Sequence, residues 1–577
     1  MDCQKRKNII LSASGSKKAQ LVLKSAKVVN VFTEELEETD VAISDGYIVG
    51  LGKYEGDMEV DLQGCFICPG FIDGHMHLES SMLAPGEFER ASLPGGTTAI
   101  VADPHEIANV AGTEGIDYML KATDDLMMKV YFTLPSCVPS SKFDEPGEVL
   151  AAEQLRRYYD NERVLGLAEL MDAHQTIKGN EEILTKVADA KKFGKIVDGH
   201  APGLRGKQTN AYVAAGVQSD HECASMDEAM EKLRRGQWIM VREGTAARNM
   251  KALLPLCKKP YSNRCMFVTD DRHPGDLLRD GHMDAVIRKA VSLGVDPVTA
   301  IKMCTLHTAQ YFNLKESGAV APGYRADLAV LSDLKDIEVH QVYIDGKLAA
   351  QDGNMLKKQP YKLPENKKIW NSFHMITISS DQLKIKKKGD HIRAIKLIEH
   401  QLLTEEIITE WTQSDGLAPG VNLSQDLVKL AVFERHHNTG HVGVGFLQGY
   451  GLKAGAIATS VAHDSHNLIV VGTNDEDMVI AANSVREQNG GLAIAKDGKI
   501  LGELPLPIAG LMSQETIEVV DKKLEHLKLT ALQLGVSEGI DPFMTLSFVS
   551  LPVIPKLRLN GHGLIDCENQ CLTDVTF

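Results

Sequence analysis

Between residues 64 and 270 the sequence alternates short apolar segments with helix-like stretches, and this alternation constrains the fold more than any other feature. Amphipathic stretches at 181–193, 226–236 and 283–294 have the spacing of helices that bury one face. Eight strands with intervening helices over about 250 residues predict a (β/α)8 barrel. The segments with strand character are 64–75, 97–103, 129–136, 163–170, 194–200, 216–221, 237–244 and 264–270.

The segments on either side of this region have a different texture. Residues 21–63 and 321–350 read as short strands joined by Asp-Gly turns, which is typical of hairpins. We expect the two flanks to form one small β-sandwich domain into which the barrel is inserted. From residue 366 onward strand-like and helix-like pieces mix, which predicts a separate C-terminal α+β domain. The expected limits are 1–64 and 319–365 for the sandwich, 65–318 for the barrel and 366–577 for the C-terminal domain.

Length, charge and cysteine content argue against several classes of protein. With 577 residues the chain is longer than one hydrophobic core usually holds. A net charge of −16 argues against a nucleic-acid partner, which usually meets a basic face. No apolar run of about 18 residues predicts a membrane span. Ten cysteines without a secretion signal predict reduced thiols in the cytoplasm, and the apolar surroundings of Cys65 and Cys68 favour a core strand over a redox or zinc pair.

The stretch GFIDGHMHLES at 70–80 contains two histidines one residue apart, His75 and His77. In an extended chain these two side chains point to the same face. Taken alone, the pair could equally be two ordinary loop histidines. Partner ligands at the ends of other predicted strands would make the pair part of a metal site.

Six potential ligands fall at the carboxyl ends of the predicted strands, where barrels of this kind place their chemistry. Each alone could be a buried histidine or a capping carboxylate, but their shared position favours one site. Six nitrogen and oxygen ligands are too many for one tetrahedral zinc ion and suit two divalent ions about 3.5–4 Å apart. The six are His75, His77, Glu169, His200, His221 and Asp270.

The chemistry of such a site follows from its ligands. Glu169 is the expected bridge, because its two oxygens can each bind one ion. No thiolate is present, so manganese or ferrous iron suits the set as well as zinc. A metal pair lowers the pKa of bound water toward 7, and Asp270 beside that water can take its proton and pass it to a leaving group. The prediction is hydrolysis at a polarised carbon–nitrogen bond or a related ester.

The motif PGFIDGHMHLESSM (69–82), with the ligands above, resembles the amidohydrolase superfamily. Within it, nearly the whole chain is similar to the bacterial adenine deaminase family. Most two-metal relatives carry a carboxylated lysine at the position of Glu169, whereas this family resembles the chain in carrying glutamate there. The matching segments are GHMHLESSML (74–83), VADPHEIANV (101–110), LPSCVPS (134–140), GLAELMD (166–172), DGHAPGLRGKQTNAYVAAG (198–216), VREGTAARN (241–249), VTDDRHPGDL (268–277), HDSHNLIVVG (463–472) and LPLPIAGLMS (504–513).

The resemblance implies hydrolysis of adenine to hypoxanthine and ammonia in purine salvage or catabolism. It implies two divalent metal ions, with manganese expected, ferrous iron an alternative and zinc less favoured. It also implies a homodimer or higher homo-oligomer. In the implied mechanism hydroxide attacks C6 of adenine, Asp270 accepts a proton, and ring N1 is protonated as the carbon becomes tetrahedral. The H-x-E…P-C-x-x-C zinc signature of cytidine-type deaminases is absent from the sequence.

Four further side chains near the predicted strand ends have open roles. Asp103 could act in catalysis by orienting the purine or assisting proton transfer, hold a further ion, or simply cap a helix. Glu79 could bind substrate, hydrogen-bond a ligand imidazole, or be a plain loop residue. Arg242 could donate to purine N3 or N7 or form a structural salt bridge. Asp271 is expected to support the site or lie at the surface rather than ligate.

The C-terminal histidine-rich segments 436–441 and 463–466 could form a second metal site, but we expect them to pack at the barrel mouth or at a subunit interface. On this hypothesis the C-terminal domain acts as a lid. Three alternative functions are an amidohydrolase acting on a cyclic amide, a deaminase of a different aminopurine or nucleoside, and an inactive scaffold. Glu169 argues against the first, which needs lysine there, and the complete ligand set argues against the last.

Overall fold

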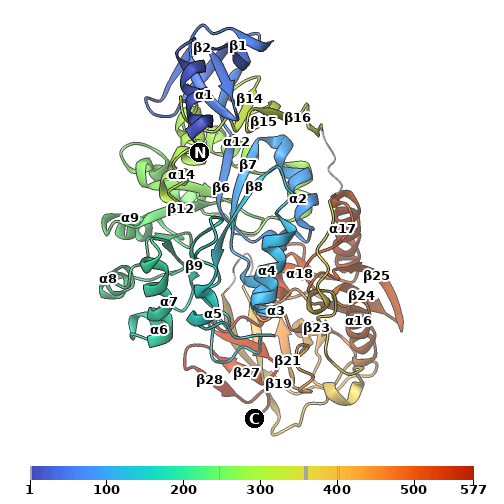
Figure 1. The fold of residues 1–577 in the computed structure, drawn as a ribbon. Helices are drawn as coiled ribbons and strands as arrows, with labels where there is room; N and C mark the ends of the chain where they lie inside the picture. The colour runs from blue at the N-terminus through green and yellow to red at the C-terminus, as the bar shows by residue number, and fades with distance from the viewer. Residues whose placement is uncertain (1–2, 246, 357–360, 399–400, 402) are drawn as a thin grey trace.

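The computed structural model describes residues 3–577 apart from 246, 357–360, 399–400 and 402. Figure 1 shows three parts: a sheet at one end built from the N-terminal strands and from β14–β16, a central region of parallel strands, and a C-terminal part drawn in yellow to red. The C-terminal part lies along one side and the lower end of the central region (Figure 1). The adjacent central and C-terminal parts supply the residues of the site described below.

All eight predicted strands of the central region are present, in two parallel sheets. Strands β10, β9, β8, β7 and β6 hydrogen-bond in this order as a five-stranded sheet, and β11, β12 and β13 form a three-stranded sheet. Their bounds are β6 Phe71–Met76, β7 Thr97–Ala102, β8 Lys129–Leu134, β9 Val164–Leu170, β10 Ile196–Gly199, β11 Ser219–Asp220, β12 Trp238–Arg242 and β13 Cys265–Val268.

The two parallel sheets approach each other at both pairs of edges. Near the edge between β13 and β6, the backbone N–H of Asp270 donates to the carbonyl of His75 (3.0 Å), and the N–H of His77 donates to the carbonyl of Asp270 (3.1 Å). Near the edge between β10 and β11, the N–H of Gln218 donates to the carbonyl of Val197 (2.9 Å). The carboxyl ends of all these strands therefore lie on one rim.

Helices follow the strands, and the three helices expected at 181–193, 226–236 and 283–294 are α7, α9 and α12. Side chains cap two of them in the usual way: Asn180 accepts from the N–H of Ile183, and Ser225 accepts from the N–H of Glu228. The bounds are α2 Pro85–Ser92, α3 His105–Ala111, α4 Thr113–Ala122, α5 Ala152–Arg156, α6 Ala173–Ile177, α7 Glu181–Lys192, α8 Gly206–Ala215, α9 Met226–Arg234, α10 Met250–Leu253, α11 Pro274–Arg279, α12 Met283–Ser292, α13 Pro297–Met303 and α14 Leu306–Tyr311.

The predicted strand at 64–75 is two strands that belong to different sheets. β5 (Phe66–Pro69) pairs with β1 and β14 in the sheet at the end of the molecule, whereas β6 begins at Phe71. Gly70 separates them, and a Cβ there would lie 2.2 Å from Thr98 Oγ1, so the close approach requires glycine. The apolar run continues across this junction, so the sequence pattern does not reveal it.

Strands from both flanks form one continuous nine-stranded sheet, so the two flanks meet in one small β domain. Ile43 and Ile48, near one end of the sheet, pack in the same apolar cluster as Leu328 and Tyr343 on β14 and β15, so the sheet curls around its own core. Its elements are α1 Cys3–Ala13, β1 Ala19–Asn30, β2 Glu35–Ser44, β3 Tyr47–Leu51, β4 Gly56–Asp61, β5 Phe66–Pro69, β14 Leu328–Leu331, β15 Val339–Ile344, β16 Lys347–Gln351 and β17 Asn354–Met355.

The C-terminal part is a separate α+β domain built on an eight-stranded sheet of order β19-β18-β21-β20-β23-β22-β24-β25, with a further three-stranded sheet, β26-β27-β28. Its elements are α15 Lys367–Trp370, β18 His391–Leu397, β19 Thr404–Glu410, β20 Leu427–Phe433, β21 Val442–Gln448, β22 Ala456–Thr459, β23 Leu468–Gly472, α16 Asp475–Glu487, β24 Gly491–Lys496, β25 Lys499–Pro505, α17 Ile517–Gln533, α18 Pro542–Val549, β26 Leu557–Asn560, β27 Gly563–Asp566 and β28 Cys571–Thr573.

None of the helices in the described part of the chain combines the length and the apolar character that a membrane crossing needs. All ten cysteines are free thiols. Cys68 is buried in β5, which agrees with the core strand expected there, and burial raises the pKa of its thiol.

Candidate active site

The carboxyl ends of five strands bring the six predicted ligands together on the shared rim. All six side chains are largely buried, and His200 keeps the most exposure, 19%. Burial of so many ionisable groups in one place is costly unless they are paired or bind cations. His75 and His77 come from the end of β6, Glu169 from β9, His200 and His221 from the residues after β10 and β11, and Asp270 from the segment after β13.

Glu169 lies at the centre of the group, and its two oxygens face different imidazoles. Oε1 is 3.3 Å from His77 Nε2. Oε2 is 2.6 Å from His200 Nδ1 and 3.2 Å from His221 Nε2. Burial alone would raise the pKa of this carboxyl, but the imidazoles of His200, His221 and His77 outweigh it and hold the pKa well below its usual range. Glu169 therefore remains an anion with one oxygen directed to each side.

The imidazoles of His75 and His77 leave nitrogens available for a cation. His77 Nδ1 lies 3.1 Å from the backbone carbonyl of Asp103, so Nδ1 carries the proton and Nε2 keeps its lone pair. His75 Nε2 is buried without a hydrogen-bond partner. The ring of His75 stacks on that of His221 at 4.3 Å between centroids. A buried, unpartnered imidazole nitrogen is unfavourable by itself and is satisfied by a bound metal ion.

Asp270 reaches the same group from the other sheet. Its Oδ1 lies 3.1 Å from His77 Nε2 and 3.5 Å from His75 Nε2. Its backbone φ of 62° is in the left-handed region, which aspartate tolerates better than most residues and which is common at functional sites. Burial would raise the pKa of this carboxyl, but the charge of Arg242 and the two imidazoles hold it well below its usual range.

The guanidinium of Arg242, at the end of β12, contacts carboxylates of the protein. Its Nη1 donates to Asp270 Oδ2 (2.6 Å). The same nitrogen contacts Glu222 Oε1, and Nη2 donates to Glu222 Oε2 (3.0 Å). These contacts make the salt bridge that the sequence left as one of two possibilities. They also fix the orientation of Asp270 relative to its histidines.

The donor set fits divalent cations. Three carboxylate oxygens and four imidazoles converge in a buried site. Nitrogen and oxygen ligands without thiolates are those that divalent manganese, iron and zinc accept. Three overlapping groups are close enough to hold ions. They are His75 with His77 and Asp270, His75 with Glu169 and His221, and His77 with Asp103, His105 and Glu169.

Comparison with known proteins gives two matches to family models. Residues 66–349 match the amidohydrolase family, and residues 401–571 match the adenine deaminase C-terminal domain. Three similar proteins span both regions. The "Adenine deaminase 2" of Carboxydothermus hydrogenoformans is 49% identical over 99% of this chain and 99% of its own length. The adenine deaminases of Clostridium acetobutylicum and Bacillus pumilus are 44% and 42% identical, over 97% and 99% of this chain and 98% and 99% of theirs.

The chain belongs to the adenine deaminase family. The matches cover both the parallel-strand region and the C-terminal domain, as the resemblance of the quoted motifs implied. This family membership favours the amidohydrolase interpretation of the six converging residues over a structural role for them.

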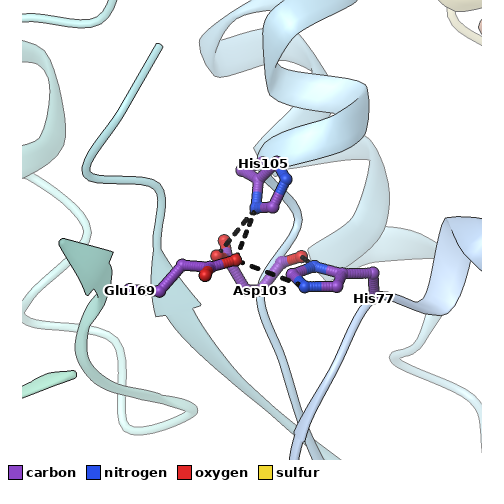
Figure 2. A group of neighbouring side chains, drawn as sticks. All are labelled: His77, Asp103, His105 and Glu169. Atoms are coloured by element: carbon purple, nitrogen blue, oxygen red, sulfur yellow. Dashed lines mark hydrogen bonds and ion pairs between the residues drawn. The ribbon is translucent and has the colours of Figure 1, made fainter. Parts of the chain in front are cut away.

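Figure 2 shows how Asp103 extends the site of this adenine deaminase family member. Asp103 follows β7, and its Oδ2 lies 2.9 Å from His105 Nδ1. The same His105 nitrogen lies 3.5 Å from Glu169 Oε1, so His105 connects the two carboxylates (Figure 2). Asp103 Oδ1 is buried without a hydrogen-bond partner. Asp103 makes no capping hydrogen bond to the helix that follows, so this geometry supports a role at the site.

Glu79 is buried beside this group. Its Oε1 accepts from the backbone N–H of Ile107 at 3.2 Å, and its Oε2 has no hydrogen-bond partner. Burial, together with the charge of Glu106, raises the pKa of Glu79 to about 7. Asp271 accepts from the hydroxyl of Ser80 at 2.6 Å, so it supports the loop after β6.

Sequence reasoning missed several residues at the site. His105 and Glu106 lie in the DPHE motif and Glu222 in SDHE, so their closeness to recognised ligands was an available signal. The histidine-rich segment with His463 and His466 was expected at the barrel mouth or at a subunit interface, but the sequence did not indicate which residue it would contact. Both contact Glu106, which places the segment 463–466 at the strand-end rim, where it was expected to pack.

Proposed function

We propose that this protein hydrolyses adenine to hypoxanthine and ammonia at a pair of divalent metal ions held by the strand-end ligands. The observation that carries the proposal is Glu169, whose two oxygens face separate sets of imidazoles within one buried site. Full-length relatives at 42–49% identity that are named adenine deaminases support the choice of substrate.

The proposed ligands divide into two sets that share Glu169. His77 faces Oε1 and forms one group with His75 and Asp270, whereas His200 and His221 face Oε2. When bound, two divalent cations would lower the pKa of a bound water enough to make hydroxide available near neutral pH. Manganese is the proposed metal, with ferrous iron an alternative and zinc less favoured, because nitrogen and oxygen ligands dominate.

Several side chains would act directly on the reacting atoms. Asp270 is the proposed base: it takes the proton of the attacking water and passes it to the departing C6 amine. Arg242 holds Asp270 through Oδ2 and leaves Oδ1 directed into the site, so we propose that it acts on the substrate through Asp270 rather than by touching the purine. Asp103 is proposed to steer proton transfer through His105, and Glu79 to bind substrate at the edge of the site.

The wider architecture belongs to the same proposal. The edge contacts between the two parallel sheets support a closed (β/α)8 barrel over 65–318. The curled sheet formed by 1–64 and 319–365 and the domain at 366–577 complete the proposed division of the chain. Family membership supports a homodimer or higher homo-oligomer in the cytoplasm, acting in purine salvage or catabolism.

The direct test is ammonia release from adenine by protein purified with manganese and without chelator. Adenosine, another aminopurine and a cyclic amide are the matched alternative substrates. Turnover of adenine with much lower rates for the others supports the proposal. Turnover of the cyclic amide or the nucleoside in preference to adenine would overturn the substrate assignment, and full activity of protein depleted of metal would overturn the mechanism.

A further inference from the structure

Glu106 joins the central region to the C-terminal domain at a buried point. It lies in the first turn of α3, next to His105, and its side chain is 2% exposed. Its Oε1 lies 2.9 Å from Nδ1 of His463, and its Oε2 contacts Nε2 of His466. His105 Nε2 is 3.4 Å from the same Oε1, and the other nitrogen of His105 lies near Glu169. A chain of contacts therefore runs from the C-terminal domain to the proposed bridging carboxylate.

The hydrogen bond made by Nδ1 of His466 determines which ring nitrogen carries the proton. Nδ1 accepts the backbone N–H of Ala462 at 3.1 Å, so Nδ1 carries no proton. A neutral ring then has its proton on Nε2, the nitrogen against Glu106. Burial lowers the pKa of His466 to about 4, which keeps the ring neutral. His466 thus presents an N–H to Glu106 at their contact, and Nε2 offers no lone pair to a cation, which argues against a third metal ion among Glu106, His463 and His466.

His463 differs from His466 in having one edge available. Its backbone is fixed to α18, with its N–H donating to the carbonyl of Ser547 at 2.8 Å, and its ring stacks on Phe548 at 4.5 Å between centroids. Glu106 occupies Nδ1. The side chain is 11% exposed and lines a cavity between the strand-end loops and the C-terminal domain. Because the Nδ1 edge is engaged, the Nε2 edge is the one left for a ligand.

The cavity beside His463 is adjacent to the proposed metal ligands. Ser80 and Asp271 line it from the loops after β6 and β13, each close in sequence to a ligand on the rim. Met82, Leu492 and Phe543 supply apolar walls, with Leu492 and Phe543 from the C-terminal domain. Apolar walls with a few polar groups are typical of a small-molecule site. Since the cavity is only about 20 Å³ in this structure, a purine enters it only when its walls separate.

We propose that His463 is a substrate-binding residue of the active site, whose Nε2–H donates to a ring nitrogen of adenine while Glu106 and His466 fix its orientation. The inference rests on the proposed adenine hydrolysis and adds the C-terminal domain to the site. Adenine presents unprotonated ring nitrogens along its edges, and each of them accepts a hydrogen bond. The C-terminal domain then contributes to substrate recognition, which goes beyond the role of a lid.

The charge of His463 agrees with this assignment. Burial would lower its pKa, but the carboxylates of Glu106, Asp271 and Asp464 outweigh burial and raise the pKa to about 9. Glu106 contacts it directly, and Asp271 faces it across the cavity. A ring that stays cationic at neutral pH keeps its Nε2 proton for donation.

Two substitutions test the Nδ1 edge and the Nε2 edge of the His463 ring separately. In His463→Asn the amide NH2 lies where Nδ1 lies in histidine, so the contact with Glu106 is retained and the Nε2 edge is lost. In His463→Gln the amide reaches the position of Nε2 but loses the Nδ1 position. The matched control is His441→Asn, because Nδ1 of His441 lies 2.6 Å from Oε1 of Glu145 in another interdomain pair, on an exposed ring that does not line the cavity.

The measurements are kcat/KM for adenine as a function of pH, metal content per chain and thermal unfolding, all on the metal-loaded full-length protein. We expect His463→Asn to keep its metal and its Tm while kcat/KM falls at least about tenfold. His463→Gln recovers part of the loss, and His441→Asn matches wild type. The wild-type profile falls as the pH passes about 9, and the Asn variant lacks that fall.

Two outcomes would overturn the inference. One is His463→Asn retaining more than half of the wild-type kcat/KM with an unchanged pH profile. The other is His463→Asn, His463→Gln and His441→Asn losing activity equally in proportion to lost stability, which would reduce His463 to a docking contact. If the wild-type protein releases no ammonia from adenine, the proposed function fails instead, and the two failures are distinguished by this first measurement.

Discussion

Replacing Glu169 with glutamine tests the bridging role of this residue with little change in shape. Its two oxygens lie 2.6–3.3 Å from three imidazole nitrogens on opposite sides. Glutamine removes the negative charge and turns one of the two oxygens into an NH2 group, which cannot bind a cation. Each ion thereby loses all or part of a charged ligand, which should weaken its binding at least about 10–100-fold, the cost of losing even an outer partner of a ligand.

Because both ions share this carboxylate, the overall metal affinity should fall at least about 10²–10⁴-fold. We expect Glu169→Gln to retain at most one ion per chain after dialysis against manganese buffer, where wild type retains two. The rate of adenine deamination should fall at least about 100-fold. Elemental analysis and ammonia release on the same samples measure the two effects.

The control is Glu145→Gln, which also removes a buried carboxylate that contacts two histidines, His441 and His562, but at the outer domain boundary. This control should keep both ions and its activity. Glu169→Gln with two ions and more than half of the wild-type kcat/KM would refute the bridging role.

Three further perturbations follow from the same contacts. Asp270→Asn should bind metal more weakly, because it removes a charged ligand, and at saturating manganese it should still lose about 10²–10⁴-fold in kcat, since an amide cannot accept the proton of water; steady-state kinetics measure this. Arg242→Lys should lower kcat about 10–100-fold with unchanged metal content, since a lysine ammonium cannot hold Asp270 and Glu222 in the same geometry; kinetics with elemental analysis check it. Burial and the charge of Asp464 raise the pKa of Asp144 to about 7, so ionising Asp144 destabilises the folded state as pH rises from about 4 to 7. Asp144→Asn should therefore gain in Tm over wild type between pH 5 and 8, by up to about 3 kcal/mol in unfolding free energy, as followed by thermal denaturation.

Each of these predictions can fail clearly. Unchanged kcat in Asp270→Asn would remove it as the base. Loss of metal in Arg242→Lys would mean that this arginine supports the ligands rather than orienting one carboxylate. A Tm difference for Asp144→Asn that is constant across pH would show that the buried carboxyl does not titrate as its surroundings indicate.

The parallel strands and their carboxyl ends could be predicted because a buried strand appears in the sequence as an apolar run that ends at a polar residue. His75, His77, Glu169, His200 and His221 all stand at such stops, and a parallel sheet brings these stops to one rim. The junction at Gly70 could not be predicted in the same way, since an apolar run does not record which sheet each half joins.

The local sequence pattern does not predict which side chains contact each other across neighbouring strands. Arg242 had two possible roles in the sequence, and its contact with Glu222 and Asp270 depends on the lateral order β11-β12-β13. The contact of Glu106 with His463 joins distant parts of the chain across a domain boundary. Periodicity and capping residues predict single helices and strands. Domain docking depends on the shape of the two surfaces, which neither pattern indicates.

Anomalous diffraction from crystals of the manganese-loaded protein tests the central claim most directly. The account predicts two anomalous peaks per chain, one beside each carboxylate oxygen of Glu169, with His75, His77 and Asp270 around the first and His200 and His221 around the second. A single peak, or peaks placed away from Glu169, would contradict it.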